Sequence, residues 1–248
     1  PSFLFSEIQP RYMRTLGIIP ARYQSSRFPG KPLADILGES MIQRVYERAK
    51  KSNLDDVIVA TDDERIAEEV KSFSGNVRMT SDQHLSGTDR CMEVAESVSK
   101  EFDIIVNIQG DEPFIEAEQI NQLIDAFESP DTQIATLAQL LEQTEDLQNY
   151  NKPKVLFDEN EMAISFDRVV NSPFKANTFY KHIGLYAFRR KILKEISQLK
   201  PSAKELELKL EQWRWLENDY NIKVKITPYD ACSVDTKDDL KKIIERFG

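Results

Sequence analysis

Short apolar segments alternate with amphipathic segments through the first half of the chain. Leu16–Pro20, Asp56–Ala60 and Ile104–Ile108 are rich in β-branched residues, which favours buried parallel strands. Val77–Met79 fits a shorter strand of the same kind. This order predicts a doubly wound, mostly parallel α/β sheet with right-handed crossovers. Apolar residues at helical spacing predict the intervening helices at Met41–Lys51, Asp63–Ser72, Asp89–Lys100 and Glu118–Phe127.

The second half of the chain is less regular. Lys154–Asp158 and Ala163–Phe166 flank a polar turn, which predicts a β-hairpin and makes the sheet a mixed one. We expect residues 13–248 to form one α/β domain and residues 1–12 to be a leader or a cloning remnant. The other expected elements are strands at Tyr180–Phe188 and Ile222–Thr227, and helices at Ser202–Asn218 and Thr236–Arg246, the last with Thr236 as N-cap.

Composition narrows the class of protein. The 248 residues carry a formal net charge of −9 and a pI of about 5.0, whereas nucleic-acid binders usually present a basic face. No apolar run approaches the roughly 18–20 residues that span a bilayer. Two cysteines and two histidines do not make a disulfide scaffold or a zinc site. We therefore expect a cytoplasmic protein with neither nucleic-acid binding nor membrane insertion.

The loop Pro20–Pro32, PARYQSSRFPGKP, follows the first strand and is basic. Arg22, Arg27 and Lys31 could neutralise a triphosphate, and arginine forms forked contacts with phosphate oxygens. Gly30 lets the backbone approach a ligand closely. Residue types alone leave a solvated basic surface loop as an equal alternative.

Acidic residues after strands suggest a magnesium site. Asp111, in Gln109-Gly110-Asp111-Glu112-Pro113, follows a buried strand, and Asp235 follows another strand-like segment. Magnesium is usually held by one or two carboxylates together with substrate phosphates. Taken alone, Asp235 also fits a plain helix N-terminal residue.

The segment Met79–Arg90, MTSDQHLSGTDR, is small and polar. Ser86, Gly87 and Thr88 offer backbone and hydroxyl groups that could shape a pocket for a base. The alternative is a turn that leads into a helix capped by Thr88 or Asp89. A lone loop histidine such as His84 is more often a surface residue than a catalyst.

Together these segments resemble the 3-deoxy-manno-octulosonate cytidylyltransferases, also called CMP-Kdo synthetases. SGTDR, QGDEP, HIGLYAFR and LEQWRWLE are more specific than PARYQSSRFPGKP, whose general form other nucleotidyltransferases share. The resemblance runs from Leu16 to about Leu240. The strings that carry it are PARYQSSRFPGKPL at 20–33, VATDDERI at 59–66, MTSDQHLSGTDRCMEV at 79–94, VNIQGDEPFI at 106–115, YKHIGLYAFR at 180–189 and LEQWRWLE at 210–217.

The resemblance implies a fold of nucleotide-sugar transferase type and a homodimer that uses CTP, an octulosonate-type acid sugar and Mg2+. Residues about 150–220 would form the sugar-pocket and dimerisation appendage. Catalysis would involve Arg22 and Lys31 on phosphate, with Asp111 and Asp235 on the metal. The implied nucleotide-binding residues are Pro20, Ala21, Arg22, Arg27, Lys31, Met79, Thr80, Ser86, Gly87 and Gln109, and the implied sugar-binding residues are Gln109, Arg168, His182, Tyr186, Glu211 and Gln212.

The second half departs from the family pattern near the sugar end. Asp167 replaces a usual Ser, Lys175 a common Arg, Leu208 a Glu, and Ser233 a Gly. These changes motivate two alternatives. One is a cytidylyltransferase for 8-amino-Kdo or another acid sugar, and the other is a catalytically silent nucleotide-binding paralogue. SGTDR and HIGLY disfavour a sialate enzyme, and the pair Asp111 and Asp235 disfavours a silent copy. Trp213 and Trp215, two apart on one expected helix, suggest that one packs at a dimer interface.

Overall fold

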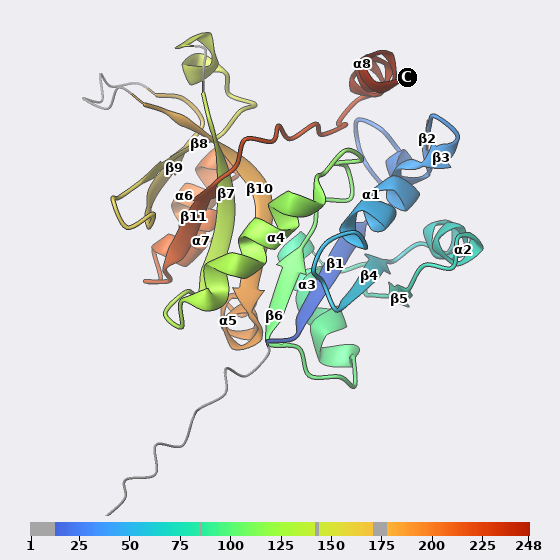
Figure 1. Cartoon of the computed structure of the whole chain (residues 1–248), viewed down its shortest axis with the longest axis horizontal. Coiled ribbons are helices and arrows are strands. Elements are labelled where there is room, and N and C mark those ends of the chain that lie inside the picture. Colours follow the sequence, from blue (N-terminus) through green and yellow to red (C-terminus); the bar gives the residue numbers. More distant parts are fainter. Residues whose placement is uncertain (1–12, 85, 142–143, 171–177) are drawn as a thin grey trace, which may run out of the picture.

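The computed structural model describes residues 13–84, 86–141, 144–170 and 178–248. In the first half, strands and helices alternate as the hydrophobic pattern predicts (Figure 1). A short β2–β3 hairpin, Asp35–Ile36 with Glu39–Ser40, was not predicted. The other elements are β1 (Thr15–Ala21), α1 (Met41–Ala49), β4 (Asp56–Thr61), α2 (Glu64–Ser72), β5 (Val77–Met79), α3 (Gly87–Ser97), β6 (Ile104–Asn107) and α4 (Ala117–Asp125).

The second half contains the expected hairpin and two elements that the sequence pattern missed. The missed elements are β7 (Ile134–Leu140) and α5 (Arg190–Ile196). The hairpin and both expected strands are confirmed, and Thr236 caps the last helix as expected. These elements are β8 (Lys154–Phe157), β9 (Ala163–Asp167), β10 (Tyr180–Arg189), β11 (Ile222–Ile226) and α8 (Lys237–Phe247).

Nine strands of the described chain form one mixed sheet. Its main path runs β11-β7-β10-β6-β1-β4-β5, and β8 and β9 extend from β10. The strands β6, β1, β4 and β5 are mutually parallel, whereas β10 runs antiparallel to both β6 and β7. The fold class is therefore the expected α/β sheet. Its parallel part brings the carboxyl ends of β1, β4 and β6 to one edge, where ligands of such sheets bind.

The helix expected over Ser202–Asn218 is two helices in the structure. Lys209 adopts a left-handed conformation with φ 54° and ends α6 (Ala203–Leu208), and α7 (Gln212–Leu216) starts after it. Both tryptophans lie on α7 and both are buried, Trp215 against the rings of Tyr186 and Phe188. Trp213 donates to the Phe166 carbonyl at 2.7 Å, and Trp215 is 0% exposed. This burial leaves little of either ring to contact a partner, and the expectation that one of them packs at a dimer interface stays a prediction.

The core consists of two large clusters of buried residues, one on each face of the sheet, and a third, smaller cluster that we call the annex. Buried residues of α1, α2 and α4 cover one face of the sheet, and those of α3, α5 and α7 cover the other. The annex lies beneath α8, where Phe28, Phe114 and Val234 pack with Ile243 of the helix. None of the helices in the described residues combines the length and apolar character that a bilayer crossing requires.

Candidate functional site

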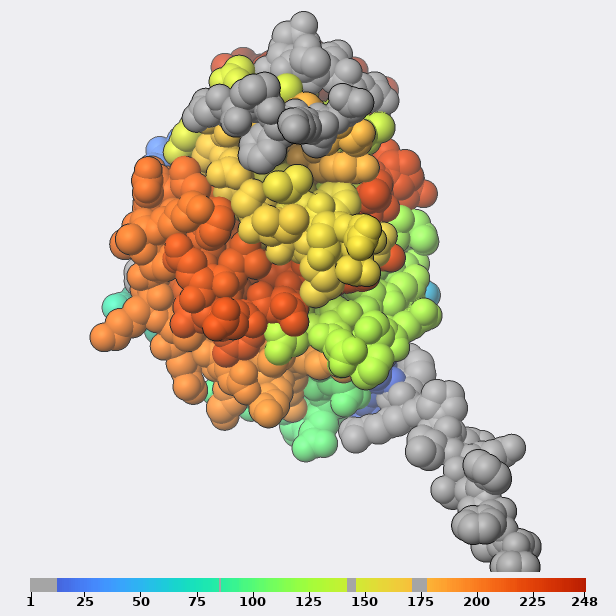
Figure 2. Space-filling model, turned by 90° about the vertical axis from the view of Figure 1, so that its left-hand side faces the viewer, coloured from blue at the N-terminus to red at the C-terminus, as the bar shows by residue number. Residues whose placement is uncertain are grey.

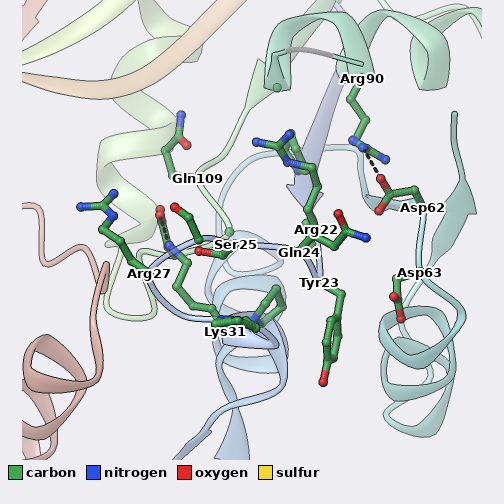
Figure 3. Close-up of a pocket in the computed structure, with 18 of the residues that line it drawn as sticks. Arg22, Tyr23, Gln24, Ser25, Arg27, Lys31, Asp62, Asp63, Arg90 and Gln109 are labelled. Carbon is green, nitrogen blue, oxygen red and sulfur yellow. Dashed lines mark hydrogen bonds and ion pairs between the residues drawn. The ribbon is translucent and has the colours of Figure 1, made fainter. Parts of the chain in front are cut away.

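A pocket of about 1190 Å³ opens at the carboxyl edge of the parallel strands (Figure 3). It collects residues from the loop after β1, the start of α2, the start of α3, the loop after β6 and the segment before α8. It therefore unites the two loops for which the sequence predicted ligand binding. The predicted residues in its wall are Pro20, Ala21, Arg22, Arg27, Lys31, Ser86, Gly87, Gln109, Asp111 and Asp235.

The basic loop after β1 folds back on itself. Gly30 has φ 73°, a left-handed conformation that glycine adopts without strain, and its N–H donates to the Tyr23 carbonyl at 2.8 Å. The Tyr23 ring packs so closely on Gly30 that a Cβ there would lie 3.2 Å from it. Phe28 anchors the loop in the annex beneath α8. This closure directs Arg22, Arg27 and Lys31 to the pocket.

Lys31 lies between the two carboxylates proposed for the metal. Its Nζ is 2.7 Å from Asp111 Oδ2 and 3.6 Å from Asp235 Oδ1. Arg27 Nη2 lies 3.0 Å from the same oxygen of Asp235. Both carboxylates therefore converge on one small volume. Two cations balance them in this structure.

Local structure fixes Asp235 beside the loop after β6. The preceding residue Val234 is 0% exposed, and its N–H donates to the Asp111 carbonyl at 2.9 Å. Asp239 accepts from the backbone N–H groups of Asp235 and Thr236 at 3.2 and 2.8 Å. Thr236 and Asp239 form a capping box that starts α8. A buried side chain and a helix cap thus hold Asp235 in place.

Glu112, next to Asp111, has a different environment. Burial, together with the neighbouring charge of Asp111, raises its pKa to about 8. Because its carboxyl group carries a proton at neutral pH, Glu112 is a poor metal ligand. Asp111 lines the pocket, whereas Glu112 is not among its lining residues.

Two polar residues at the other end of the pocket were not predicted. Arg90 is only 1% exposed and donates to Asp62 Oδ2 at 2.9 Å and to the Thr80 hydroxyl. Both Arg90 and Asp62 line the pocket, and they lie in the strings SGTDR and VATDDERI. Of the two predicted residues in this region, Thr80 contacts Arg90, which lines the pocket. Met79 is 47% exposed and is not among the lining residues.

The start of α3 forms another part of the wall. Ser86 is the N-cap and accepts from the Asp89 N–H at 3.1 Å, so the predicted caps Thr88 and Asp89 are wrong by two or three residues. A Cβ on Gly87 would lie 3.5 Å from both Pro20 and Asn107. His84 pairs with Glu93 of α3, which suits a structural role in the loop.

The predicted sugar-binding residues other than Arg168 form a largely buried polar cluster that begins at Gln109 in the pocket wall. Gln109 Nε2 donates to the Gly184 carbonyl at 2.7 Å, and His182 Nε2 lies 3.0 Å from Thr136 Oγ1. Gln212 donates to the Tyr186 hydroxyl. Glu211 accepts from Thr88 Oγ1 at 2.8 Å and borders a second pocket of about 650 Å³, which also contacts Ser86.

Burial dominates the electrostatics of this cluster. It lowers the pKa of His182 to about 3, with Arg168 as a second cause, so the imidazole is neutral. It raises the pKa of Glu211 and of Tyr186. Two buried oxygens of the cluster, Glu211 Oε1 and Gln212 Oε1, have no hydrogen-bond partner among the described residues, although Arg214 Nη2 lies 3.9 Å from the first; Asn107 Oδ1 nearby has none either. Unpartnered acceptors suit a ligand with several hydroxyl donors.

Arg168 occupies a place that the sequence did not predict. Its Nε and Nη2 donate to the carbonyls of Leu208 and Lys209, both at 2.8 Å, at the end of α6. The side chain therefore does not line the main pocket described above, and it holds the turn that leads to Glu211. The described neighbour Leu208 packs against the core, Ser233 is exposed, and Lys175 lies outside the described residues.

Comparisons with known proteins agree with this geometry. A family model described as cytidylyltransferase matches residues 16–226. A 3-deoxy-manno-octulosonate cytidylyltransferase of Parabacteroides distasonis is 51% identical over 245 residues, covering 94% of this chain and 97% of the relative. One of Fusobacterium nucleatum is 49% identical over 236 residues, covering 94% and 96%. The solved structure of CMP:2-keto-3-deoxy-manno-octonic acid synthetase complexed with CTP is 37% identical with a TM-score of 0.89, covering 94% of this chain and 98% of that one.

Proposed function

Because the chain belongs to the cytidylyltransferase family, we propose that it joins CTP to the 2-hydroxyl of 3-deoxy-manno-octulosonate. The observation that carries this function is the convergence of Arg22, Lys31, Asp111 and Asp235 on one pocket next to a buried polar cluster. The 2-hydroxyl of the sugar releases its proton to solvent as its oxygen forms a bond to the α-phosphorus of CTP. The bond from that phosphorus to the β-phosphate oxygen breaks, and pyrophosphate leaves. Such transfer depends on positioning and on stabilising phosphate charge, so no protein nucleophile is needed.

The cations of the basic loop are proposed to bind the triphosphate. Arg22 and Lys31 would contact the phosphates and stabilise the departing pyrophosphate, with Arg27 nearby. Lys31 and Arg27 form ion pairs with Asp111 and Asp235, which supports a role for both cations beside the proposed metal site. Pro20, Ala21, Ser86 and Gly87 would frame the nucleoside, and Met79 and Thr80 would support that wall.

Asp111 and Asp235 fit a magnesium ion. Their oxygens both approach the same ammonium group, so they converge on a single cation, and carboxylate oxygen is the donor that magnesium prefers. We propose that these two residues hold Mg2+ together with phosphate oxygens. When bound, the ion would offset phosphate charge and lower the pKa of the attacking hydroxyl.

The buried cluster is proposed to bind the acid sugar. Gln109 lines the pocket and contacts Gly184 in β10, so it links the nucleotide side to His182, Tyr186, Glu211 and Gln212. The unpartnered oxygens of Glu211 and Gln212 could accept from sugar hydroxyls. Arg168 would act by holding the turn before Glu211.

Two alternatives concern the same pocket. One is activation of 8-amino-Kdo or another acid sugar, because the family pattern changes at Asp167 and Lys175. The other is a silent paralogue that binds nucleotide without turnover. Asp111, Asp235 and the cations Arg22 and Lys31 all line the pocket, which favours turnover.

We propose that the active form is a homodimer in the cytoplasm and that its product serves lipopolysaccharide synthesis. The family resemblance supports all three features.

The proposed dimer surface carries exposed apolar residues. Leu206 of α6 and Ile164 of β9 are 66% and 55% exposed. Arg168, just after β9, donates a hydrogen bond to the Leu208 carbonyl at the end of α6, so the two elements are neighbours. Both lie on the face seen in Figure 2. Light scattering at increasing protein concentration tests the dimer, and Leu206→Glu should shift it towards monomer.

The central experiment is pyrophosphate release from CTP and Mg2+ with a panel of acid sugars. The panel contains 3-deoxy-manno-octulosonate, its 8-amino derivative and a sialate. We expect the first to give the highest kcat/KM. A preference for the 8-amino sugar would move the assignment to the first alternative. Absence of release with every sugar, together with measurable CTP binding, would identify a silent paralogue.

A further inference from the structure

The pair Arg90 and Asp62 forms a buried donor–acceptor group in the wall of the nucleotide pocket. Arg90 Nη2 donates to Asp62 Oδ2 at 2.9 Å, and Nη1 contacts Thr80. The side chain of Arg90 is 1% exposed, and that of Asp62 is 18% exposed. Arg90 comes from α3, Asp62 follows β4, and Thr80 follows β5. One guanidinium therefore ties three elements together at this wall.

The position of the pair fits the base of the nucleotide. Figure 3 shows Arg90 and Asp62 on one side of Arg22, and Lys31 with Arg27 on the other. The phosphates belong near Lys31, where the cations and carboxylates converge. A nucleotide that starts there and follows the pocket past Arg22 places its base near Asp62. Ser86 and Gly87 line the same stretch of wall.

The pair has spare hydrogen-bonding capacity of the required kind. A guanidinium carries five N–H donors and no acceptor, so the contacts to Asp62 and Thr80 leave further donors on Arg90. An ionised carboxylate accepts at both oxygens, and the contact to Arg90 uses Oδ2. Both residues line the pocket, so a ligand there would meet a donor residue and an acceptor residue that are bonded to each other.

Cytosine and uracil differ in the order of their donor and acceptor groups. Cytosine has an acceptor at N3 next to the N4 amine, which is a donor. Uracil has a donor at N3 next to the O4 carbonyl, which is an acceptor. Arg90 can donate to N3 of cytosine while Asp62 accepts from the N4 amine. With uracil, two donors meet at Arg90 and two acceptors meet at Asp62, which leaves buried polar groups unpaired.

We propose that Arg90 and Asp62 read the base and make the enzyme select CTP over UTP. This role rests on the proposed cytidylyl transfer, since it concerns the nucleotide of that reaction. Asp62 would contact the base directly. Arg90 would both contact the base and hold Asp62 in place. Sites that pair a substrate's polar groups reject analogues that lack them more strongly than apolar pockets do.

The wild-type enzyme and modified nucleotides test the proposal without a mutation. The triphosphate of 4-deaminocytidine lacks the N4 amine, and that of 3-deazacytidine lacks the N3 acceptor. We expect each to bind roughly 10- to 100-fold more weakly than CTP in calorimetry, with UTP at least as weak. Equal affinity for CTP and 4-deaminocytidine triphosphate would overturn the role of Asp62.

Asp62→Asn then tests the assignment to the pair. The amide keeps the size of the side chain but replaces one acceptor by a donor. We expect the CTP/UTP affinity ratio to fall at least about tenfold, and the variant to lose most of its discrimination against the 4-deamino analogue. Asp63→Asn is the matched control. Asp63 lines the same pocket but accepts a hydrogen bond from Arg65. Asparagine also caps helices well, so the variant should fold. The CTP/UTP affinity ratio of Asp63→Asn should therefore equal the wild-type ratio.

Two readouts separate this inference from the proposed function. If CTP binds with the expected selectivity but no acid sugar releases pyrophosphate, base reading stands and the transfer activity fails. If turnover occurs and Asp62→Asn keeps the wild-type CTP/UTP ratio, the activity stands and base reading by this pair fails. Arg90→Lys keeps a positive charge beside Asp62. This variant should therefore retain more of the CTP/UTP selectivity than Arg90→Met does.

Discussion

Lys31 Nζ lies 2.7 Å from Asp111 Oδ2, in a region where a divalent cation and a triphosphate are both proposed to bind. The ammonium group also lies 3.6 Å from Asp235. Lys31 cannot neutralise both carboxylates and bind phosphate at full strength at the same time. Nucleotide binding should therefore draw Lys31 towards the phosphates and leave the carboxylates to the metal.

This exchange predicts that metal and nucleotide strengthen each other's binding. We expect the affinity for Mn2+, followed by its paramagnetic signal, to rise at least about tenfold when CTP is added. Lys31→Met should raise the affinity for Mn2+ alone and reduce the gain from CTP. Lys241→Met, on exposed α8, should leave both values unchanged. Equal Mn2+ affinity with and without CTP would contradict the exchange.

Asp111→Asn and Asp235→Asn should each lower kcat about 100-fold or more, because each removes a proposed metal ligand. Pyrophosphate release at saturating Mg2+ and CTP measures the effect. Asp238→Asn is the control, since this carboxylate of α8 is 82% exposed. Near-normal turnover of either site variant would show that its carboxylate does not hold the metal.

Gly110→Ala should impair catalysis by steric conflict. A Cβ on Gly110 would lie 2.7 Å from the Pro20 carbonyl oxygen, which is too close for either backbone to remain in place. The loop with Asp111 must then move away from the loop with Arg22. We expect kcat to fall roughly 10- to 100-fold with a melting temperature close to wild type. Gly38 has φ 90° in a distant turn, where alanine is strained. Gly38→Ala should therefore lower the melting temperature and leave kcat close to wild type.

His182 should make the folded state sensitive to acid. Burial holds its folded pKa at about 3, below the unfolded value of 6.5, so the unfolded chain binds the proton more tightly. Stability is therefore lost as the pH falls from 6.5 towards 3. Between pH 7 and pH 5 the His182 contribution should fall by about 2 kcal/mol. Urea denaturation of His182→Asn, compared with wild type at both pH values, should show a smaller pH dependence, and an equal dependence would rule out this assignment.

Arg168→Lys should weaken acid-sugar binding more than CTP binding. A lysine cannot donate to the Leu208 and Lys209 carbonyls as a planar fork does, so the turn before Glu211 should loosen. We expect KM for the sugar to rise several-fold while KM for CTP changes less than twofold. An equal rise in both constants would indicate a general loss of structure.

Local patterns predicted the parallel half of the fold because strands such as Asp56–Thr61 consist of buried β-branched residues between clear turns. They missed β7, whose strand IATLAQL contains alanines and a buried threonine. They also missed the break at Lys209, because a left-handed residue other than glycine leaves little local signal.

The candidate site, like the fold, could be predicted from the sequence only where a local pattern marked its residues. The sequence offered Asp111 and Asp235 as a possible magnesium pair because each follows a strand, while Asp235 taken alone also fitted a helix N-terminus; the family resemblance then favoured the pair. Arg90 and Asp62 were present in quoted motifs but were not recognised as a pair. Their contact depends on how α3 packs beside β4, which no local pattern contains.

The late position of Asp235 in the chain has a consequence for protein synthesis. Every strand of the sheet has been translated before the segment that carries Asp235 leaves the ribosome. The basic loop and Asp111 are therefore complete well before the second carboxylate is available. On the proposed metal assignment, a chain that stops short of Asp235 could contact nucleotide through the basic loop but could not carry out cytidylyl transfer.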